Sequence, residues 1–170
     1  MSDEPRYTAP AHIEEHHELT AFDCGQPELN AWLRRQALRN EASGAWPTYV
    51  TGVEGRIVGY YALATGAAAR AAATGKVRRQ MPDPIPVMII GRLAVDARYQ
   101  GRGLGYGLLR SALLRTLHVA TQTGIRAVLL HAMTADAKRF YQRAGFHESP
   151  VDPMTMMIAI ADIEKALRTA

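Results

Sequence analysis

The feature that most constrains this chain is a glycine-rich turn, RYQGRGLGYG, between an apolar strand and a long amphipathic helix. The aliphatic run Val87–Val95 predicts a buried strand. Apolar residues at helical spacing predict a helix from Leu104 to about Thr123, which Gly124 ends. Glycines let a backbone approach a ligand closely, and the first amides of a helix point free donors at an anion. The turn is therefore a candidate diphosphate site.

The spacing of the glycines excludes two common phosphate-binding loops. The dinucleotide-binding fingerprint G-x-G-x-x-G fails whether it is started at Gly101 or at Gly103, and the Gly-Lys-Ser/Thr ending of a P-loop does not occur in the turn. The pattern that fits is Q-x-x-G-x-G, formed by Gln100, Gly103 and Gly105.

Composition predicts one folded domain over residues 1–170. The chain is 48% hydrophobic and 21% charged, which is ordinary for a globular protein. Cys24 is the only cysteine, so an internal disulfide and a multi-cysteine metal site are excluded. Apolar runs are too short to cross a membrane, and the polar, acidic start Met1–Arg6 is unlike a secretory signal. We expect a cytoplasmic protein that does not associate with membranes.

The net charge of +4 comes mainly from arginines, whose planar fork pairs with two phosphate oxygens. Arg98 and Arg102 add charge at the rim of the glycine-rich turn. Arg78 and Arg79 lie in a proline-flanked stretch with two interpretations: a solvated loop, or a contact to an RNA backbone. Arginines predicted on the first helix would share that RNA contact: Arg34, Arg35 and Arg39.

The remaining elements alternate in the second half of the chain, which predicts a mixed α/β domain with some parallel pairing. The expected elements are a short strand around Arg6–Ala9, a helix from Pro27 to about Asn40, strands Thr48–Val53 and Arg56–Thr65 joined by a hairpin at Glu54-Gly55, a short helix or loop within Gly66–Pro86, a strand Arg126–Ala132, a helix Asp136–Ala144, a strand Met154–Ile160 and a helix Ile163–Thr169.

Three segments in this order make the sequence resemble the GNAT acetyltransferase superfamily: GRLAVD at 91–96, the glycine-rich turn, and AKRFYQRAGF at 137–146. In that family the turn binds the pyrophosphate of coenzyme A, and the bulged strand before it holds the pantetheine arm. The resemblance implies an α/β fold of the α+β type. Its central sheet is mixed, mostly antiparallel and twisted, is splayed between the fourth and fifth strands, and is flanked by helices. Acetyl-CoA is the implied co-substrate, and no metal is expected.

The resemblance also assigns individual residues. It implies that Tyr141 is the acid that protonates the departing thiolate, and that backbone amides near Val95 polarise the thioester carbonyl. Because neighbouring helical residues point about 100° apart, we expect Phe140 to face the core and Tyr141 a cleft. Packing is the alternative role for Tyr141. The implied cofactor-binding residues are Leu93, Ala94, Val95, Arg98, Gln100, Gly101, Arg102, Gly103, Leu104, Gly105, Thr134 and Lys138.

The histidines are weaker candidates. His131 ends a predicted strand and is either a base or substrate contact, or an ordinary strand-end histidine. We include it, with Arg78 and Arg79, among the substrate-binding candidates. A metal site at His12, His16 and His17 is disfavoured, since no acidic or cysteine partners stand at a fixed spacing.

A narrower resemblance covers the first half of the chain. The sequence is similar to the acetyltransferase toxins of bacterial toxin–antitoxin pairs, the TacT-like subgroup, and departs from it at His131-Ala132-Met133, where the subgroup often has an acidic residue. This similarity implies aminoacyl-tRNA as substrate, a ribbon-helix-helix antitoxin and a homodimer. It is carried by residues 22–25, 29–33, 57–63 and 86–96.

The implied chemistry needs no strong base. An α-amino group has a pKa of about 7.7–8.0, so much of it is neutral at physiological pH and attacks acetyl-CoA directly, without an acetyl-enzyme. Cys24 is accordingly not expected to be a nucleophile. Two alternatives stay open: an ordinary GNAT enzyme that acetylates a small-molecule or protein amine, and a non-catalytic regulator that binds acetyl-CoA.

Overall fold

A computed structural model describes residues 5–79 and 81–169. Residues 1–4, 80 and 170, which belong to the expected domain, lie outside this description. The chain divides into two compact units, which we describe separately. The first unit comprises residues 1–64 and 92–112, and the second comprises residues 65–91 and 113–170.

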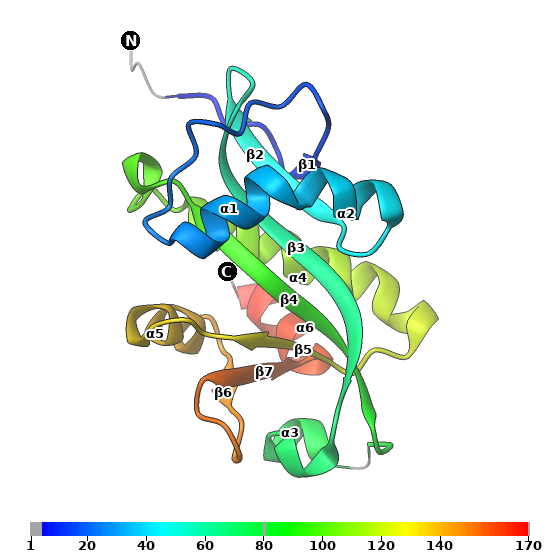
Figure 1. Cartoon of the computed structure of the whole chain (residues 1–170). Coiled ribbons are helices and arrows are strands. Elements are labelled where there is room, and N and C mark those ends of the chain that lie inside the picture. The colour runs from blue at the N-terminus through cyan, green and yellow to red at the C-terminus, as the bar shows by residue number, and fades with distance from the viewer. Residues whose placement is uncertain (1–4, 80, 170) are drawn as a thin grey trace. The chain divides into compact units, whose positions relative to one another are not determined.

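The strands form one mixed sheet in the order β1-β2-β3-β4-β5-β7-β6, which confirms the predicted fold class (Figure 1). Pairing is parallel between β4 and β5, and antiparallel in β1–β2, β2–β3, β5–β7 and β6–β7. The strands are β1 (Ala11–His12), β2 (Thr48–Val53), β3 (Arg56–Ala68), β4 (Ile85–Val95), β5 (Ala127–His131), β6 (His147–Glu148) and β7 (Thr155–Ala159). The helices are α1 (Pro27–Arg35), α2 (Ala37–Ser43), α3 (Gly75–Arg78), α4 (Leu104–Thr123), α5 (Ala135–Arg143) and α6 (Ile160–Thr169), with 3-10 turns at Arg70–Ala72 and Ala97–Tyr99.

In the first unit, α1 and α2 lie across β2 and β3 (Figure 1). The hairpin between these strands turns at Glu54 and Gly55, both at positive φ, as the sequence predicts. The apolar faces of the helices and strands close one core, which consists of Ile13, Leu19, Phe22, Trp32, Leu33, Ala37, Val50, Ile57, Tyr60, Ala62 and Ala94.

Two expectations for this unit are wrong. The single helix ending near Asn40 is two helices, because Gln36 adopts a non-helical φ of −121° and its carbonyl oxygen accepts from both the backbone and the side chain of Asn40. The strand expected at Arg6–Ala9 forms instead at Ala11–His12. The β2–β3 register shifts between Thr51 and Gly52, opposite this segment, and there Thr8 bonds to Gly52 without regular pairing.

In the second unit, β4 pairs with β5 from Val87 to Ile90, and β5 ends at His131. The last residues of β4, from Arg92 to Val95, belong to the first unit. The helix α3 packs against strands of this unit through Val77, and α6 follows β7 directly. The core of this unit consists of Ala68, Ala73, Val77, Ile85, Val87, Ala127 and Met157. In the part of the chain that the structure describes, every helix is too short or too polar to cross a lipid bilayer.

Candidate active site

The glycine-rich turn joins β4 to α4 in the first unit. Gly101 and Gly103 have φ values of +77° and +84°, a region that disfavours every residue with a Cβ. The first backbone bond of α4 runs from the Gly107 amide to the Gly103 carbonyl, at 3.0 Å. Within the described residues, the amides of Leu104, Gly105 and Tyr106 therefore have no backbone acceptor. Free amides and the positive end of a 20-residue helix together suit a diphosphate.

The side chains of Gln100 and Arg102, both within the turn, contact different parts of the protein. The Gln100 side chain donates to the carbonyl oxygens of Val95 (2.9 Å) and Cys24 (3.4 Å), so it ties the turn to the end of β4. Arg102 lies 5.4 Å from the Tyr99 ring centroid and donates to the Tyr7 hydroxyl at 3.4 Å. These contacts hold the Arg102 charge beside the turn, where the sequence predicted it.

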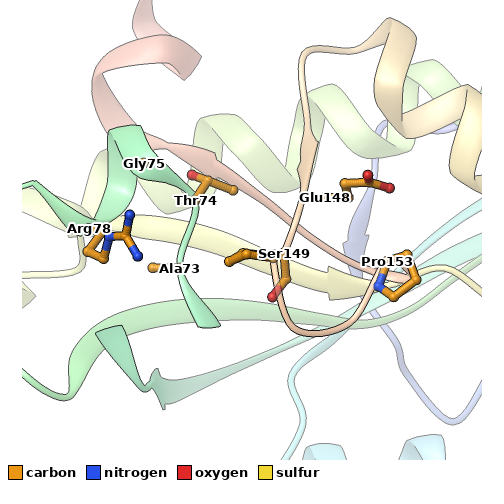
Figure 2. A pocket seen from close by; sticks show the side chains of 8 residues that line it. Ala73, Thr74, Gly75, Arg78, Glu148, Ser149 and Pro153 are labelled. Atoms are coloured by element: carbon orange, nitrogen blue, oxygen red, sulfur yellow. The ribbon is translucent and has the colours of Figure 1, made fainter. Parts of the chain in front are cut away.

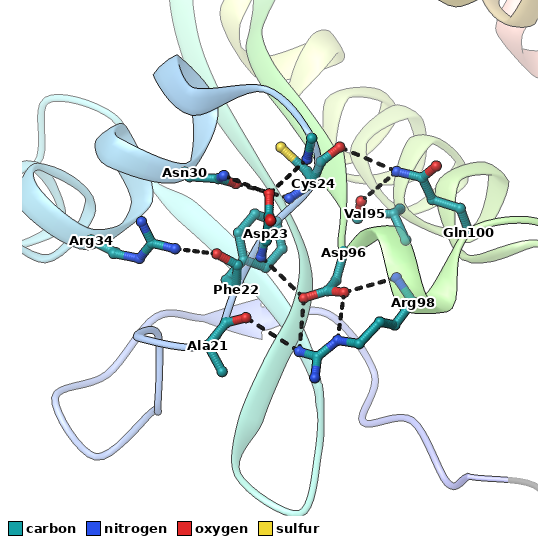
Figure 3. A network of polar contacts seen from close by, with 11 residues as sticks. Ala21, Phe22, Asp23, Cys24, Asn30, Arg34, Val95, Asp96, Arg98 and Gln100 are labelled. Atoms are coloured by element: carbon teal, nitrogen blue, oxygen red, sulfur yellow. Dashed lines mark hydrogen bonds and ion pairs between the residues drawn. The ribbon is translucent and has the colours of Figure 1, made fainter.

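Arg98 pairs with Asp96, an acidic residue that the sequence did not single out. Asp96 is 1% exposed and accepts bonds from the backbone and side chain of Arg98 and from the Asp23 amide. Arg98 also donates to the Ala21 carbonyl oxygen at 3.2 Å. Figure 3 shows these contacts, which join the segment before α1 to the end of β4. We call Asp96, Arg98, Asp23 and Ala21 the clasp. Contact of Arg98 with the cofactor stays a prediction.

The clasp gives Asp96 an acid-sensitive contribution to stability. Burial would raise the pKa of Asp96, but the bonds from Arg98 and the Asp23 amide hold it below its usual value. The ionised form is therefore favoured by folding, and its contribution is complete above about pH 4 and lost as pH falls through the lowered pKa.

We predict that Asp96→Asn lowers the free energy of unfolding at pH 7 by about 1–3 kcal/mol, since buried donors lose a charged acceptor. Urea unfolding at pH 7 and at about pH 3 measures it, and the difference between variant and parent must shrink at the lower pH. Asp136→Asn is the matched control, because the Asp136 side chain is 88% exposed and pairs only with Arg139 among its described contacts. An equal loss in both variants would contradict the role of the clasp.

Tyr141 lies on α5 in the second unit. Thr134 caps this helix by accepting from the Ala137 amide at 3.0 Å. Tyr141 is 7% exposed, and its ring meets those of Phe140 and Phe146 at centroid distances of 5.1 and 5.7 Å. The hydroxyl has no hydrogen-bond partner recorded among residues 5–79 and 81–169, and burial raises its pKa to about 12. It is therefore a protonated phenol that is free to serve a ligand.

The prediction that Phe140 faces the core and Tyr141 a cleft is wrong. Phe140 is half-buried, and Tyr141 is the more buried of the two. The chain reverses at Gly145, which has a φ of +105°, and brings the buried Phe146 against the Tyr141 ring. Tyr141 therefore packs through its ring and keeps its hydroxyl free of protein bonds.

The other predicted residues of the second unit have protein partners. The Lys138 ammonium pairs with Glu148 at 2.5 Å, and Thr134 caps α5. His131 Nδ1 lies 3.2 Å from Thr155 Oγ1 and 3.7 Å from Asp152 Oδ2, which leaves Nε2 unbonded among the described residues. The contact of Asp152 with His131 was not predicted from the sequence, because an aspartate in an ordinary turn carries no sequence signal. Cofactor and substrate contacts of these residues stay predictions.

Arg78 and Arg79 are exposed at the end of α3. Arg78 lines an open pocket of about 500 Å³, where Figure 2 shows its guanidinium on one side and Glu148 on the other. Tyr141 and His131 do not line this pocket. Its lining residues are Ala73, Thr74, Gly75, Arg78, Glu148, Ser149, Pro150 and Pro153.

The structure brings His16 and His17 together with an acidic partner, Glu14. Their ligand atoms lie within 4.8 Å of one another, and the Glu14 amide donates to His17 Nδ1 at 2.9 Å. The argument that these histidines lack an acidic partner is therefore wrong, because the turn supplies one. His12 is not in the cluster and pairs with Glu41.

Comparison with protein families matches residues 45–148 to the acetyltransferase (GNAT) domain. With a mixed sheet and a Q-x-x-G-x-G turn before α4, this shows that the chain belongs to the GNAT family, and it is an N-acetyltransferase.

Relatives of known name indicate a particular branch of the family. The chain is 46% identical, over 92% of its length and 94% of the relative, to the tRNA-acetylating toxin of Mycobacterium tuberculosis H37Rv. It is 28% identical, over 89% of its length and 90% of the relative, to the probable toxin TacT of Sinorhizobium fredii NGR234. Among solved structures, a mutant of the toxin AtaT bound to the C-terminus of the antitoxin AtaR and acetyl-CoA is similar with a TM-score of 0.81 and 25% identity, covering 96% of this chain and 99% of that one.

Proposed function

We propose that this chain is a toxin that transfers the acetyl group of acetyl-CoA to the α-amino group of aminoacyl-tRNA and so blocks translation. The observation that carries the proposal is the 46% identity to a tRNA-acetylating toxin over 92% of the chain. At this identity, with 94% of the relative covered, the comparison spans both units.

Acetyl-CoA binding rests mainly on the first unit. The free amides at the start of α4 donate hydrogen bonds to the pyrophosphate, with Arg102 at the rim. The backbone of Leu93–Val95 holds the pantetheine arm, and Thr134 and Lys138 of the second unit complete the set. The relative solved with acetyl-CoA supports acetyl-CoA as the ligand.

The reaction is a direct displacement. The neutral amine attacks the thioester carbonyl, the N–C bond forms, and the C–S bond breaks as the tetrahedral intermediate collapses. Tyr141 gives its proton to the sulfur, and the proton lost by the nitrogen restores the phenol. A pKa of about 12 keeps Tyr141 protonated at neutral pH, ready to act as the acid. An acetyl-enzyme is not needed, and Cys24 is poorly suited to form one, since burial raises the pKa of its thiol.

The proposal extends to the partners of the chain and to its place in the cell. An antitoxin of the ribbon-helix-helix class neutralises the chain, which the toxin solved with AtaR supports. The chain acts as a homodimer in the cytoplasm, where aminoacyl-tRNA is used. Both units form one catalytic domain over residues 1–170, supported by a family match that runs through parts of both. Arg78, Arg79 and His131 contact the substrate.

The deciding experiment supplies purified protein with radiolabelled acetyl-CoA and individually charged tRNAs. We expect label in one or a few aminoacyl-tRNAs, and mild alkali to release it as the N-acetyl amino acid. Uncharged tRNA is the control and stays unlabelled. Label only in polyamines or peptides would point to an ordinary GNAT enzyme, and binding of acetyl-CoA without any transfer would point to a regulator.

A further inference from the structure

Arg92 contacts the rings of two tryptophans in the first unit. It lies on β4, and its guanidinium carbon is 4.4 Å from the ring centroid of Trp32 and 5.8 Å from that of Trp46. Trp32 belongs to α1 and is 5% exposed, while Trp46 follows α2 and is half-buried. We call these three residues the Arg92 box. Two indole rings from segments far from β4 in sequence attract the cation and hold it in place.

The guanidinium of Arg92 has no anionic partner in the described chain. Arg98 bonds to Asp96, Arg139 to Asp136, and Arg34 to a backbone carbonyl. For Arg92, by contrast, no hydrogen bond or ion pair with residues 5–79 or 81–169 is recorded. It is half-buried, and burial lowers its pKa. Within the described residues, a half-buried cation whose donors are unpaired and reach solvent is available to an anionic group of a ligand.

The position of the box relates it to the reaction. Arg92 precedes Leu93, the first residue of the strand segment assigned to the pantetheine arm. Arg92 and Ala94 share one face of the strand, about 7 Å apart along it. An anion bound by Arg92 therefore lies beside the segment at which we place the thioester.

We propose that the Arg92 box binds a phosphate at the acceptor end of the aminoacyl-tRNA and so positions the amine. This inference rests on the proposed function. In an esterified amino acid the carboxyl group carries no charge, so the nearest anion is the 5′-phosphate of the terminal nucleotide. The arginine fork matches two phosphate oxygens, and the two indole rings hold the cation in place.

Arg92→Gln tests the proposal through steady-state kinetics with the charged tRNA identified above. We expect KM for the tRNA to rise about tenfold, with the slope of log(kcat/KM) against log[salt] smaller in magnitude by about one. The Kd for acetyl-CoA and the rate with an amino-acid methyl ester, an acceptor without phosphate, stay within about twofold of the parent. Arg110→Gln is the matched control, because it removes an exposed arginine from α4 of the same unit and leaves KM unchanged.

Two further variants keep the test decisive. Arg92→Lys retains the charge without the fork, so it raises KM less than Arg92→Gln and preserves the salt slope. Trp46→Leu retains the arginine, and raises KM with an unchanged salt slope. A KM for Arg92→Gln equal to that of the parent overturns the inference. Equal losses with tRNA and with the methyl ester also overturn it, because they show a structural role. Failure of the parent to acetylate any charged tRNA instead refutes the proposed function.

Discussion

The Tyr141→Phe variant loses about two to four orders of magnitude in kcat for acetyl transfer, the range expected when a positioned acid is removed. Its affinity for acetyl-CoA is unchanged, because the phenylalanine ring keeps the contacts with Phe140 and Phe146. The free energy of unfolding is also unchanged, since the Tyr141 hydroxyl has no partner within the described chain that its removal would leave unpaired. Single-turnover acetylation measures the rate, calorimetry with acetyl-CoA measures the affinity, and urea unfolding measures the stability.

A second tyrosine supplies the control for this experiment. Tyr61 is fully buried, and its hydroxyl lies 2.7 Å from Ser111 Oγ. Tyr61→Phe therefore lowers the free energy of unfolding by about 1 kcal/mol but leaves kcat within about twofold. A Tyr141→Phe variant that acetylates as fast as the parent removes the acid role from Tyr141, and the sulfur must then take its proton from another group.

The strand before the glycine-rich turn and the helix after it could be predicted, because their sequence signals are local. An apolar run predicts a strand over Val87–Val95, and in the structure this strand begins two residues earlier, at Ile85. Helical spacing predicts a helix from Leu104 to about Thr123, and the structure has the helix with these bounds. The break at Gln36 and the displacement of the first strand to Ala11–His12 depend on tertiary contacts. The local sequence pattern does not reveal such contacts, so these two elements were predicted at the wrong positions.

In the candidate site, too, short motifs could be predicted from the sequence and contacts between distant segments could not. A glycine turn of fixed spacing and an aromatic pair in a helix are short motifs, and both are present in the structure as expected. The clasp between Asp96 and the Asp23 amide joins residues 73 positions apart, and the stacking of Arg92 on Trp32 also joins distant segments. Neither pair has a spacing that could be recognised in one sequence. Arg98 shows the consequence, since a residue predicted as a ligand contact also has a structural partner.

Gly103→Glu weakens the binding of acetyl-CoA by about a hundredfold or more, corresponding to about 2.7 kcal/mol. The loss arises because a carboxylate is brought to the amides that would hold the diphosphate. The backbone φ of +84° also strains any residue with a Cβ, and this strain of about 1–3 kcal/mol lowers the stability of the fold. A Cβ at Gly103 meets nothing within 4 Å, so the chain folds and the loss falls on the ligand. Calorimetry on protein freed of coenzyme A measures the change in Kd.

Gly124→Glu is the matched control, because it introduces a similar strain and the same charge away from the phosphate site. Gly124 follows the last turn of the same helix, with a φ of +74° and an equally open surrounding. Its substitution imposes a similar backbone strain and the same charge, yet leaves the Kd for acetyl-CoA within about twofold, because the amides at the other end of α4 are untouched. If Gly103→Glu also binds acetyl-CoA like the parent, the pyrophosphate does not lie on the turn. The assignment of Gly101–Gly105 to the cofactor would then be wrong, although the family would stand.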